Sequence, residues 1–198
     1  FEYASYFGSS DDLKKITSYS INRLYPEIIK FDNPTLALLD LVMHKQIDLV
    51  VDWMRVGFIH GVMNTDNTSI SAESFDYGPC AFINAYDPEK VYSSIDRNSR
   101  YAFGNQSRVL KWNILRFAEA LLPIIDHSKD KSIQLAEAII NKFDKVWEEK
   151  YYDMMLKKIG LDSNDILLYP LVDELLLLMK NLKLDYTNTF YLLCQDNL

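Results

Sequence analysis

The sequence predicts a mainly α-helical (α+β) fold, in which polar loops and a small β-hairpin interrupt a helical bundle. Glycine and proline occur only six times each in 198 residues, which favours long regular elements. Apolar residues make up 48% of the chain, enough to form a sizeable core at this length. They recur at spacings of three and four, as on the buried face of a helix. We therefore expect one domain spanning residues 1–198.

The first two helices have clear start and stop signals. Ser9 is followed closely by acidic residues, the pattern of a helix N-terminus, and this helix should stop near Pro26. The second should begin at Asn33, a capping residue that precedes a proline at the first helical position. It should run to about Arg55, because Gly57 stands just past its end.

Polar residues on the second predicted helix form one narrow stripe. Asp40, His44, Asp48 and Asp52 are each four residues apart, so they share one face of the helix. The ordinary interpretation is a solvated stripe on an otherwise apolar helix. Acid–His–acid spacing also leaves open the alternative of a metal-binding face.

Loops dominate the next part of the chain. Short β-compatible pieces between residues 58 and 83 predict a loop followed by a small hairpin, with its turn at residues 71–73. Residues 84–106 have no clear periodicity and predict a long ordered loop, which in a compact domain is usually functional.

Helices resume in the second half of the chain. Their apolar spacing and their capping residues predict four more segments. These are residues 107–123, residues 130–159, residues 162–179 with an interruption near Pro170, and a short last helix capped by Asp185.

Charge and cysteine content exclude several classes of function. The net charge of −7 is a poor match to a nucleic-acid-binding protein, and no basic run or long apolar segment suggests a membrane partner. Cys80 and Cys194 are far apart and lack a CxxC spacing, so neither a disulfide framework nor a zinc site is expected. We expect a reducing compartment: the cytoplasm, or the mitochondrion if the source is a eukaryote.

The candidate chemistry lies in the polar loops after residue 60. Asp66, Asn67 and Asp76 supply two carboxylates and an amide, which are hard oxygen ligands of the kind that Mg²⁺ prefers. A carboxylate can also accept a proton from an attacking hydroxyl. Protein kinases place an aspartate and an asparagine on the catalytic loop and a further aspartate in Asp-Phe-Gly, where this chain has Asp76-Tyr77-Gly78. The alternative is an ordinary polar turn with capping Asx residues.

A longer string extends this similarity. The segment FIHGVMNTDNTSISAESFDYGPCAF, residues 58–82, resembles the active-site block of the selenoprotein O family. The resemblance continues through YDPEKVYSSIDRNSRYAFGNQ, WNILRFAEALLP, LYPEI and DYTNTF, so it spans almost the whole chain.

The resemblance implies a protein-kinase-like C-terminal lobe that transfers AMP from ATP to serine, threonine or tyrosine hydroxyls of proteins. It implies that Asp66 is the catalytic base, and that Asn67 and Asp76 bind Mg²⁺ or Mn²⁺ together with the nucleotide. His60 stands where the kinase loop has a histidine that supports the backbone, so a structural role is expected. ATP and protein substrates are the implied partners.

The phosphate-covering lobe of this family has no counterpart in the sequence. No two of the six glycines form GxG, so we expect residues 1–10 to be the remnant of a connection to a missing N-terminal lobe. The fragment alone should be inactive. Two alternatives remain open at this point: a non-catalytic, pseudokinase-like binding module that uses its acidic surface, and an ordinary phosphotransferase.

Overall fold

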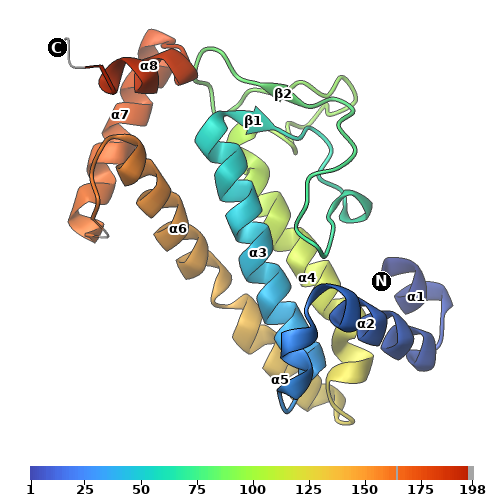
Figure 1. The fold of residues 1–198 in the computed structure, drawn as a ribbon. Coiled ribbons are helices and arrows are strands. Elements are labelled where there is room, and N and C mark those ends of the chain that lie inside the picture. Colours follow the sequence, from blue (N-terminus) through green and yellow to red (C-terminus); the bar gives the residue numbers. More distant parts are fainter. Residues whose placement is uncertain (164, 196–198) are drawn as a thin grey trace. The chain divides into compact units, whose positions relative to one another are not determined.

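The computed structural model describes residues 1–163 and 165–195, which are mainly helical as predicted (Figure 1). The chain forms two compact units, and the helices α3 (Pro34–Val56) and α4 (Gln106–Ile125) each continue from one unit into the other. The first unit contains residues 1–46, 64–75 and 110–144, and the second contains residues 47–63, 76–109 and 145 onward.

Helices α1 (Glu2–Phe7) and α2 (Ser10–Leu24) begin the first unit. The start of α2 confirms the predicted cap: Ser9 Oγ accepts from the amide of Asp12 at 3.2 Å, and the Asp12 carboxylate accepts from the amide of Ser9 at 3.0 Å. The helix ends just before Pro26, which opens the short 3₁₀ helix η1 (Pro26–Lys30). Residues 1–10, expected to be a connecting segment, include α1.

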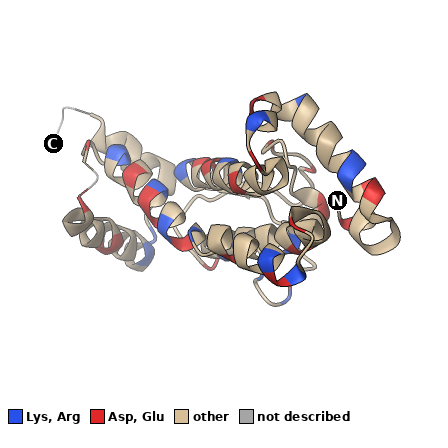
Figure 2. Ribbon diagram, turned by 90° about the horizontal axis from the view of Figure 1, so that it is seen from below, with Lys and Arg blue, Asp and Glu red and all other residues tan. Residues whose placement is uncertain are grey.

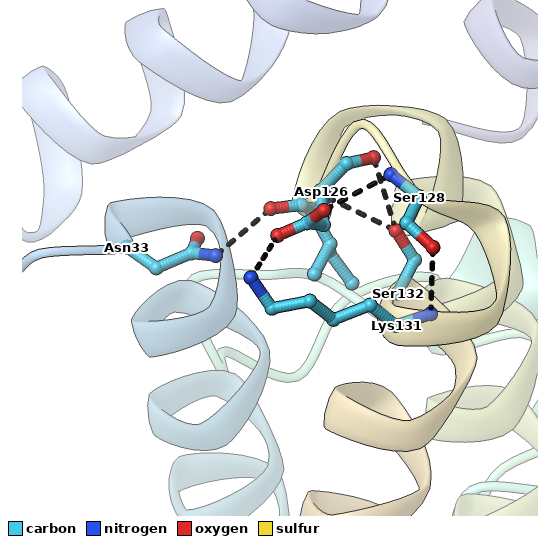
Figure 3. Close-up of polar contacts among 6 residues, drawn as sticks. Asn33, Asp126, Ser128, Lys131 and Ser132 are labelled. Carbon is cyan, nitrogen blue, oxygen red and sulfur yellow. Dashed lines mark hydrogen bonds and ion pairs between the residues drawn. The ribbon is translucent and has the colours of Figure 1, made fainter.

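The start of α3 is tied to the end of α4. Asn33 Oδ1 caps α3 by accepting from the amide of Leu36 at 3.0 Å, and Asn33 Nδ2 donates to the carbonyl of Ile125 at 2.9 Å. Figure 3 shows the same corner continuing into the next helix, where Asp126 meets Ser128, Lys131 and Ser132. The core of this unit includes residues from both helices: Leu38, Leu39, Val42, Met43, Leu110, Ile114 and Leu121.

The single helix predicted over residues 130–159 is wrong. The structure has α5 (Lys129–Ile140) and α6 (Phe143–Lys158), separated by a short break. At the break, the amide of Asn141 bonds to the carbonyl of Glu137 at 2.9 Å and the amide of Lys142 bonds to the carbonyl of Ile139 at 3.0 Å. Asparagine is a weak helix former, and Phe143, the first residue of α6, is buried with only 2% of its surface exposed. Gly160 ends α6 with φ +82°, as expected.

The sheet in the second unit differs from the predicted hairpin. Strand β1 (Phe58–Ile59) pairs antiparallel with β2 (Ala81–Phe82), with Phe58 opposite Phe82 and Ile59 opposite Ala81. The pieces at residues 68–70 and 74–75, expected to be strands of a tight hairpin, are turn and coil. Their polar groups bond locally instead: the amide of Ala72 donates to the carbonyl of Ser69 at 3.0 Å, and Ser69 Oγ contacts Ser71 Oγ at 2.6 Å.

The long loop after β2 is anchored by the last helices of the same unit. Helix α7 (Tyr169–Leu182) leads to α8 (Tyr186–Leu193), which Asp185 caps as predicted. The buried Tyr186 stacks on Tyr86 with the ring centroids 5.7 Å apart, and its hydroxyl donates to the carbonyl of Met54 at 2.8 Å. The loop therefore has fixed contacts, as the sequence predicted for an ordered loop, and its regular structure includes a β-bridge from Ala85 to Asp185 and the 3₁₀ turn η3 (Phe103–Asn105).

The predicted start of α7 at residues 162–163 is wrong. Asp165 instead caps the 3₁₀ helix η4 (Ile166–Leu168) by accepting from the amide of Leu167 at 3.0 Å, and α7 follows it. Pro170 lies in the first turn of α7, where its missing N–H leaves no helical bond unmade. Within the described part of the chain, no helix is both long and apolar enough to cross a bilayer.

Candidate functional site

The candidate site lies on the excursion that leaves β1 at Ile59 and returns at β2. Buried Gln106, the first residue of α4, holds the departing strand from within the second unit. Its amide nitrogen donates to the carbonyl of Phe58 at 3.0 Å, and its oxygen accepts from the amide of His60 at 3.1 Å. One side chain thus satisfies the carbonyl of the first residue of β1 and the amide of the residue directly after the strand.

His60 occupies a buried position directly after β1. Its surface is 0% exposed, its ring stacks on Trp53 with centroids 5.3 Å apart, and Nδ1 accepts from the amide of Val62 at 3.4 Å. These contacts support the expected structural role, because the ring shapes the backbone and does not reach the surface.

Gly61 brings the two limbs of the excursion together within the second unit. Its φ is +84°, and a Cβ atom there would lie 2.7 Å from the carbonyl oxygen of Pro79. Only glycine permits both the left-handed backbone and this close approach. The glycine therefore sets the direction in which the loop leaves the strand.

Asp66 and Asn67 lie together on the 3₁₀ turn η2 (Thr65–Asn67) in the first unit. The amide of Asn67 donates to the carbonyl of Asn64 at 3.0 Å, which closes the turn. The Asp66 side chain is exposed, whereas Asn67 is half-buried. A short helical turn thus presents one carboxylate to solvent beside an amide.

Three buried side chains that the sequence did not single out hold the residues after this turn. Asn113 Nδ2 donates to Thr68 Oγ1 at 2.8 Å, Gln46 Nε2 donates to the carbonyl of Ser69, and Tyr25 Oη donates to the carbonyl of Ile70 at 2.6 Å. A signal was present for Asn113, a polar residue between the apolar Trp112 and Ile114, but not for Gln46, which follows the polar His44 and Lys45. Nothing in the sequence indicated their partners.

Asp76 belongs to the second unit and has an unusual backbone. Its φ is +56°, a left-handed conformation that is uncommon outside glycine but that aspartate tolerates. The amide of Gly78 donates to the carbonyl of Asp76 at 2.8 Å, so Asp76-Tyr77-Gly78 forms a tight turn. The Asp76 side chain is exposed. Backbone strain of this kind clusters at functional sites.

The three predicted residues have the chemistry of a hard-cation site. Asp66 and Asn67 are neighbours on one turn of the first unit, and Asp76 lies in the second. Among the residues that the structure describes, neither the Asp66 nor the Asp76 carboxylate forms a hydrogen bond or an ion pair. Carboxylate and amide oxygens are the ligands that Mg²⁺ takes, so the donor set fits that ion.

The alternative metal face on α3 is wrong. Asp40 pairs with Lys142 at 3.5 Å, Asp48 pairs with Lys150, and Asp52 pairs with Arg55 at 3.0 Å. Acidic and basic residues are interspersed along the helices (Figure 2). No three His, Cys, Asp or Glu side chains in residues 1–163 and 165–195 are grouped so as to hold a metal ion. The stripe is a row of surface ion pairs.

Comparison with known proteins identifies the family. The family model described as protein adenylyltransferase SelO matches residues 1–197. The chain is 49% identical over 193 residues to the protein nucleotidyltransferase YdiU of Pelagibacter ubique, which covers 98% of the chain and 40% of that protein. It is 48% identical over 200 residues to the YdiU protein of Alcanivorax borkumensis, covering 100% of the chain and 41% of that protein. The YdiU protein of Bacillus cereus is 46% identical over 196 residues.

The chain thus spans about two fifths of the length of these relatives. The match includes β1, the 3₁₀ turn with Asp66 and Asn67, and the turn at Asp76. The chain belongs to the SelO family of protein adenylyltransferases.

Proposed function

We propose that this chain is the part of a protein adenylyltransferase that supplies the catalytic base and the metal ligands. The reaction is the transfer of AMP from ATP to a serine, threonine or tyrosine hydroxyl of a protein. The observation that carries the proposal is the exposed, unpaired carboxylate of Asp66 on its 3₁₀ turn, in a chain of this family.

Asp66 has the exposure and the chemistry of a general base. A substrate hydroxyl attacks the α-phosphorus of ATP, an oxygen–phosphorus bond forms, and the bond from the α-phosphorus to pyrophosphate breaks. The hydroxyl proton passes to the Asp66 carboxylate. A base of this kind acts by position, since it must lie within hydrogen-bond reach of the hydroxyl.

Asn67 and Asp76 would hold the metal ion and, through it, the nucleotide. Bound Mg²⁺ or Mn²⁺ offsets negative charge on the phosphate oxygens. Asp76 has a positive φ, +56°, a conformation in which a β-branched or bulky residue would be strained. The amide of Asn67 adds a neutral oxygen beside Asp66.

The proposed architecture is a protein-kinase-like C-terminal lobe. Buried helices, one small antiparallel sheet and polar loops after β1 are consistent with it. Since the chain spans about 40% of the relatives' length, the nucleotide's remaining contacts would come from a further lobe of the intact protein. On this basis the 198-residue chain alone should not turn over ATP.

The test is intact-mass measurement of an acceptor incubated with ATP and Mg²⁺. We would use the intact protein with α-casein, an unfolded acceptor rich in hydroxyl groups, and would also follow the mass of the enzyme itself. The expected product is heavier by one AMP. Asp66→Asn keeps the shape of the side chain but removes its basicity, so the AMP adduct should fall by at least 100-fold.

Asp32→Asn is the matched control, because Asp32 is an exposed aspartate of the same unit outside the site. It should leave the AMP adduct unchanged. A phosphate-sized adduct would show an ordinary phosphotransferase. No adduct on either protein, together with no Mg²⁺-dependent ATP binding in calorimetry, would show a non-catalytic binding module.

A further inference from the structure

Three buried donors bind three consecutive residues directly after the Asp66–Asn67 turn. Asn113 bonds to Thr68, Gln46 bonds to Ser69 and Tyr25 bonds to Ile70. We propose that these three side chains are positioning residues, which hold the turn so that Asp66 meets its substrate in one geometry. This inference rests on the proposed function, since it assigns roles around the same site.

Asn113 acts on the turn itself through Thr68. The Thr68 hydroxyl accepts from Asn113 Nδ2 at 2.8 Å and donates to the carbonyl of Asn64 at 3.0 Å. Asn64 and Thr68 are the residues that flank η2 on either side. The hydroxyl therefore closes the turn across its ends, and the side chain of α4, only 3% exposed, fixes the direction of that hydroxyl.

Gln46 and Tyr25 hold the chain that leaves the turn. Gln46 is 2% exposed on α3, and Tyr25, 4% exposed, follows the last residue of α2. Burial raises the pKa of the Tyr25 phenol above its usual value, so the group stays protonated and donates at physiological pH. The two donors bind backbone carbonyls, so they locate the chain whatever side chains it carries.

The three donors come from elements far apart in the sequence. Asn113 and Gln46 lie on long helices, whereas residues 68–70 have no regular secondary structure. A loop on its own would leave Asp66 mobile, and a displacement of about 1 Å can cost 100-fold in rate. Attachment of the loop to packed helices is the arrangement expected of groups that support a catalytic residue.

The first experiment is a double-mutant cycle in the intact protein. Thr68→Val and Asn113→Ala should each lower kcat for AMP transfer by about 10- to 100-fold with little change in the KM for ATP. The double variant should be no less active than the less active single variant, because both changes remove the same hydrogen bond between Asn113 and Thr68. Thr68→Ser keeps the hydroxyl and should restore most of the activity.

Thr17→Val is the matched control for Thr68→Val. Thr17 is a buried threonine of the same unit, and its hydroxyl donates to the carbonyl of Leu13 within α2. Thr17→Val should lower the thermal stability about as much as Thr68→Val does, but it should leave kcat unchanged. An equal loss of kcat in Thr17→Val and Thr68→Val would overturn the positioning role, because general destabilisation would then explain both.

Hydrogen–deuterium exchange gives a readout that needs no activity. In the intact protein, peptides covering residues 60–75 should exchange faster in Asn113→Ala and Tyr25→Phe than in the wild type, while peptides of α2 stay unchanged. If the variants exchange faster but the wild-type protein transfers no AMP, the proposed function is overturned, while the hold of the three donors on residues 68–70 stands. If the variants stay fully active and their exchange is unchanged, the positioning role is overturned and the proposed function stands.

Discussion

Lys158 holds its ammonium group over the ring of Tyr186, with Nζ 3.9 Å from the ring centroid. It lies equally close to the ring of Phe190 and donates to the carbonyl of Arg55 at the end of α3. A lysine near the C-terminus of a helix can donate to a carbonyl that has no partner within the helix, and its positive charge interacts favourably with the helix dipole. Lys158 thereby joins three helices of the second unit.

The stability of this junction should depend on pH. Burial, reinforced by the charge of Arg55, lowers the pKa of Lys158 to about 7, whereas the aromatic rings oppose the shift by attracting the cation. An unfolded lysine titrates near 10.4, so between about pH 7 and 10 the unfolded chain binds more protons. Stability should rise with pH in this window, by up to about 1 kcal/mol per pH unit.

Urea unfolding at pH 7, 8 and 9 checks this prediction. Lys158→Met keeps the apolar stem and should remove the rise of stability with pH. Lys157→Met is the control. Lys157 forms an ion pair with Asp153 at 2.9 Å that raises its pKa, so the Lys157→Met variant should keep the rise of stability with pH. A flat wild-type profile would show that the rings hold Lys158 in its charged form.

Ser132→Ala should destabilise the corner drawn in Figure 3. The buried Ser132 hydroxyl accepts from the amide of Asp126 at 3.0 Å and donates to its carbonyl at 3.2 Å. Alanine leaves both groups without this partner, at a cost of about 1–3 kcal/mol in the free energy of unfolding. Urea denaturation measures the change, and Ser18→Ala on the exposed face of α2 should stay within about 0.5 kcal/mol of wild type.

The loss of folding stability at low pH should also depend on the Asp126 carboxylate at this corner. The Lys131 ammonium, together with the amide of Ser128, lowers the pKa of Asp126 below its usual 3.8. The folded state therefore gains stability from the ionised carboxylate above pH 3.8 and loses it as the pH falls below that value. Asp126→Asn should lower the Tm at pH 6 and flatten the decline below pH 4. An unchanged decline in circular dichroism melts would exclude this contribution.

Gly57→Ala and Gly160→Ala separate backbone strain from packing. Both glycines have positive φ, +73° and +82°, and alanine in that conformation costs about 1–2 kcal/mol. A Cβ at Gly57 would lie 3.0 Å from side-chain atoms of Ile83 and Tyr186, whereas one at Gly160 meets nothing within 4 Å. Urea unfolding should show the larger loss for Gly57→Ala. Equal losses would mean that the neighbours of Gly57 move aside freely.

Asp76→Gly should separate stability from activity. Glycine adopts φ +56° without strain, so the variant should be within about 1 kcal/mol of wild type in stability. AMP transfer should nevertheless fall by at least 100-fold, because one proposed metal ligand is lost. Ser99→Gly is the matched control, since Ser99 also has a positive φ, +54°, and lies in the same unit but beyond the segment between β1 and β2. Retained activity in Asp76→Gly would remove Asp76 from the proposed ligand set.

Local chemistry made several elements predictable from the sequence. The starts of α2 at Ser9 and of α3 at Asn33 depend on capping bonds that span three residues. The sequence pattern also located the polar segment with Asp66, Asn67 and Asp76, because a string of neighbouring residues carried the family resemblance that the family match over residues 1–197 confirms. These features need no knowledge of distant contacts.

Only the tertiary structure decided the features that depend on residues far apart in the sequence. The burial of Phe143 accompanies the break between α5 and α6, and Phe58 pairs with Phe82 across the whole polar excursion. The hydrogen bond from Asn113 to Thr68 joins residues that are 45 positions apart in the sequence. Helix periodicity and capping describe neighbours along the chain, whereas strand pairing and buried hydrogen bonds select partners by their proximity in the folded protein.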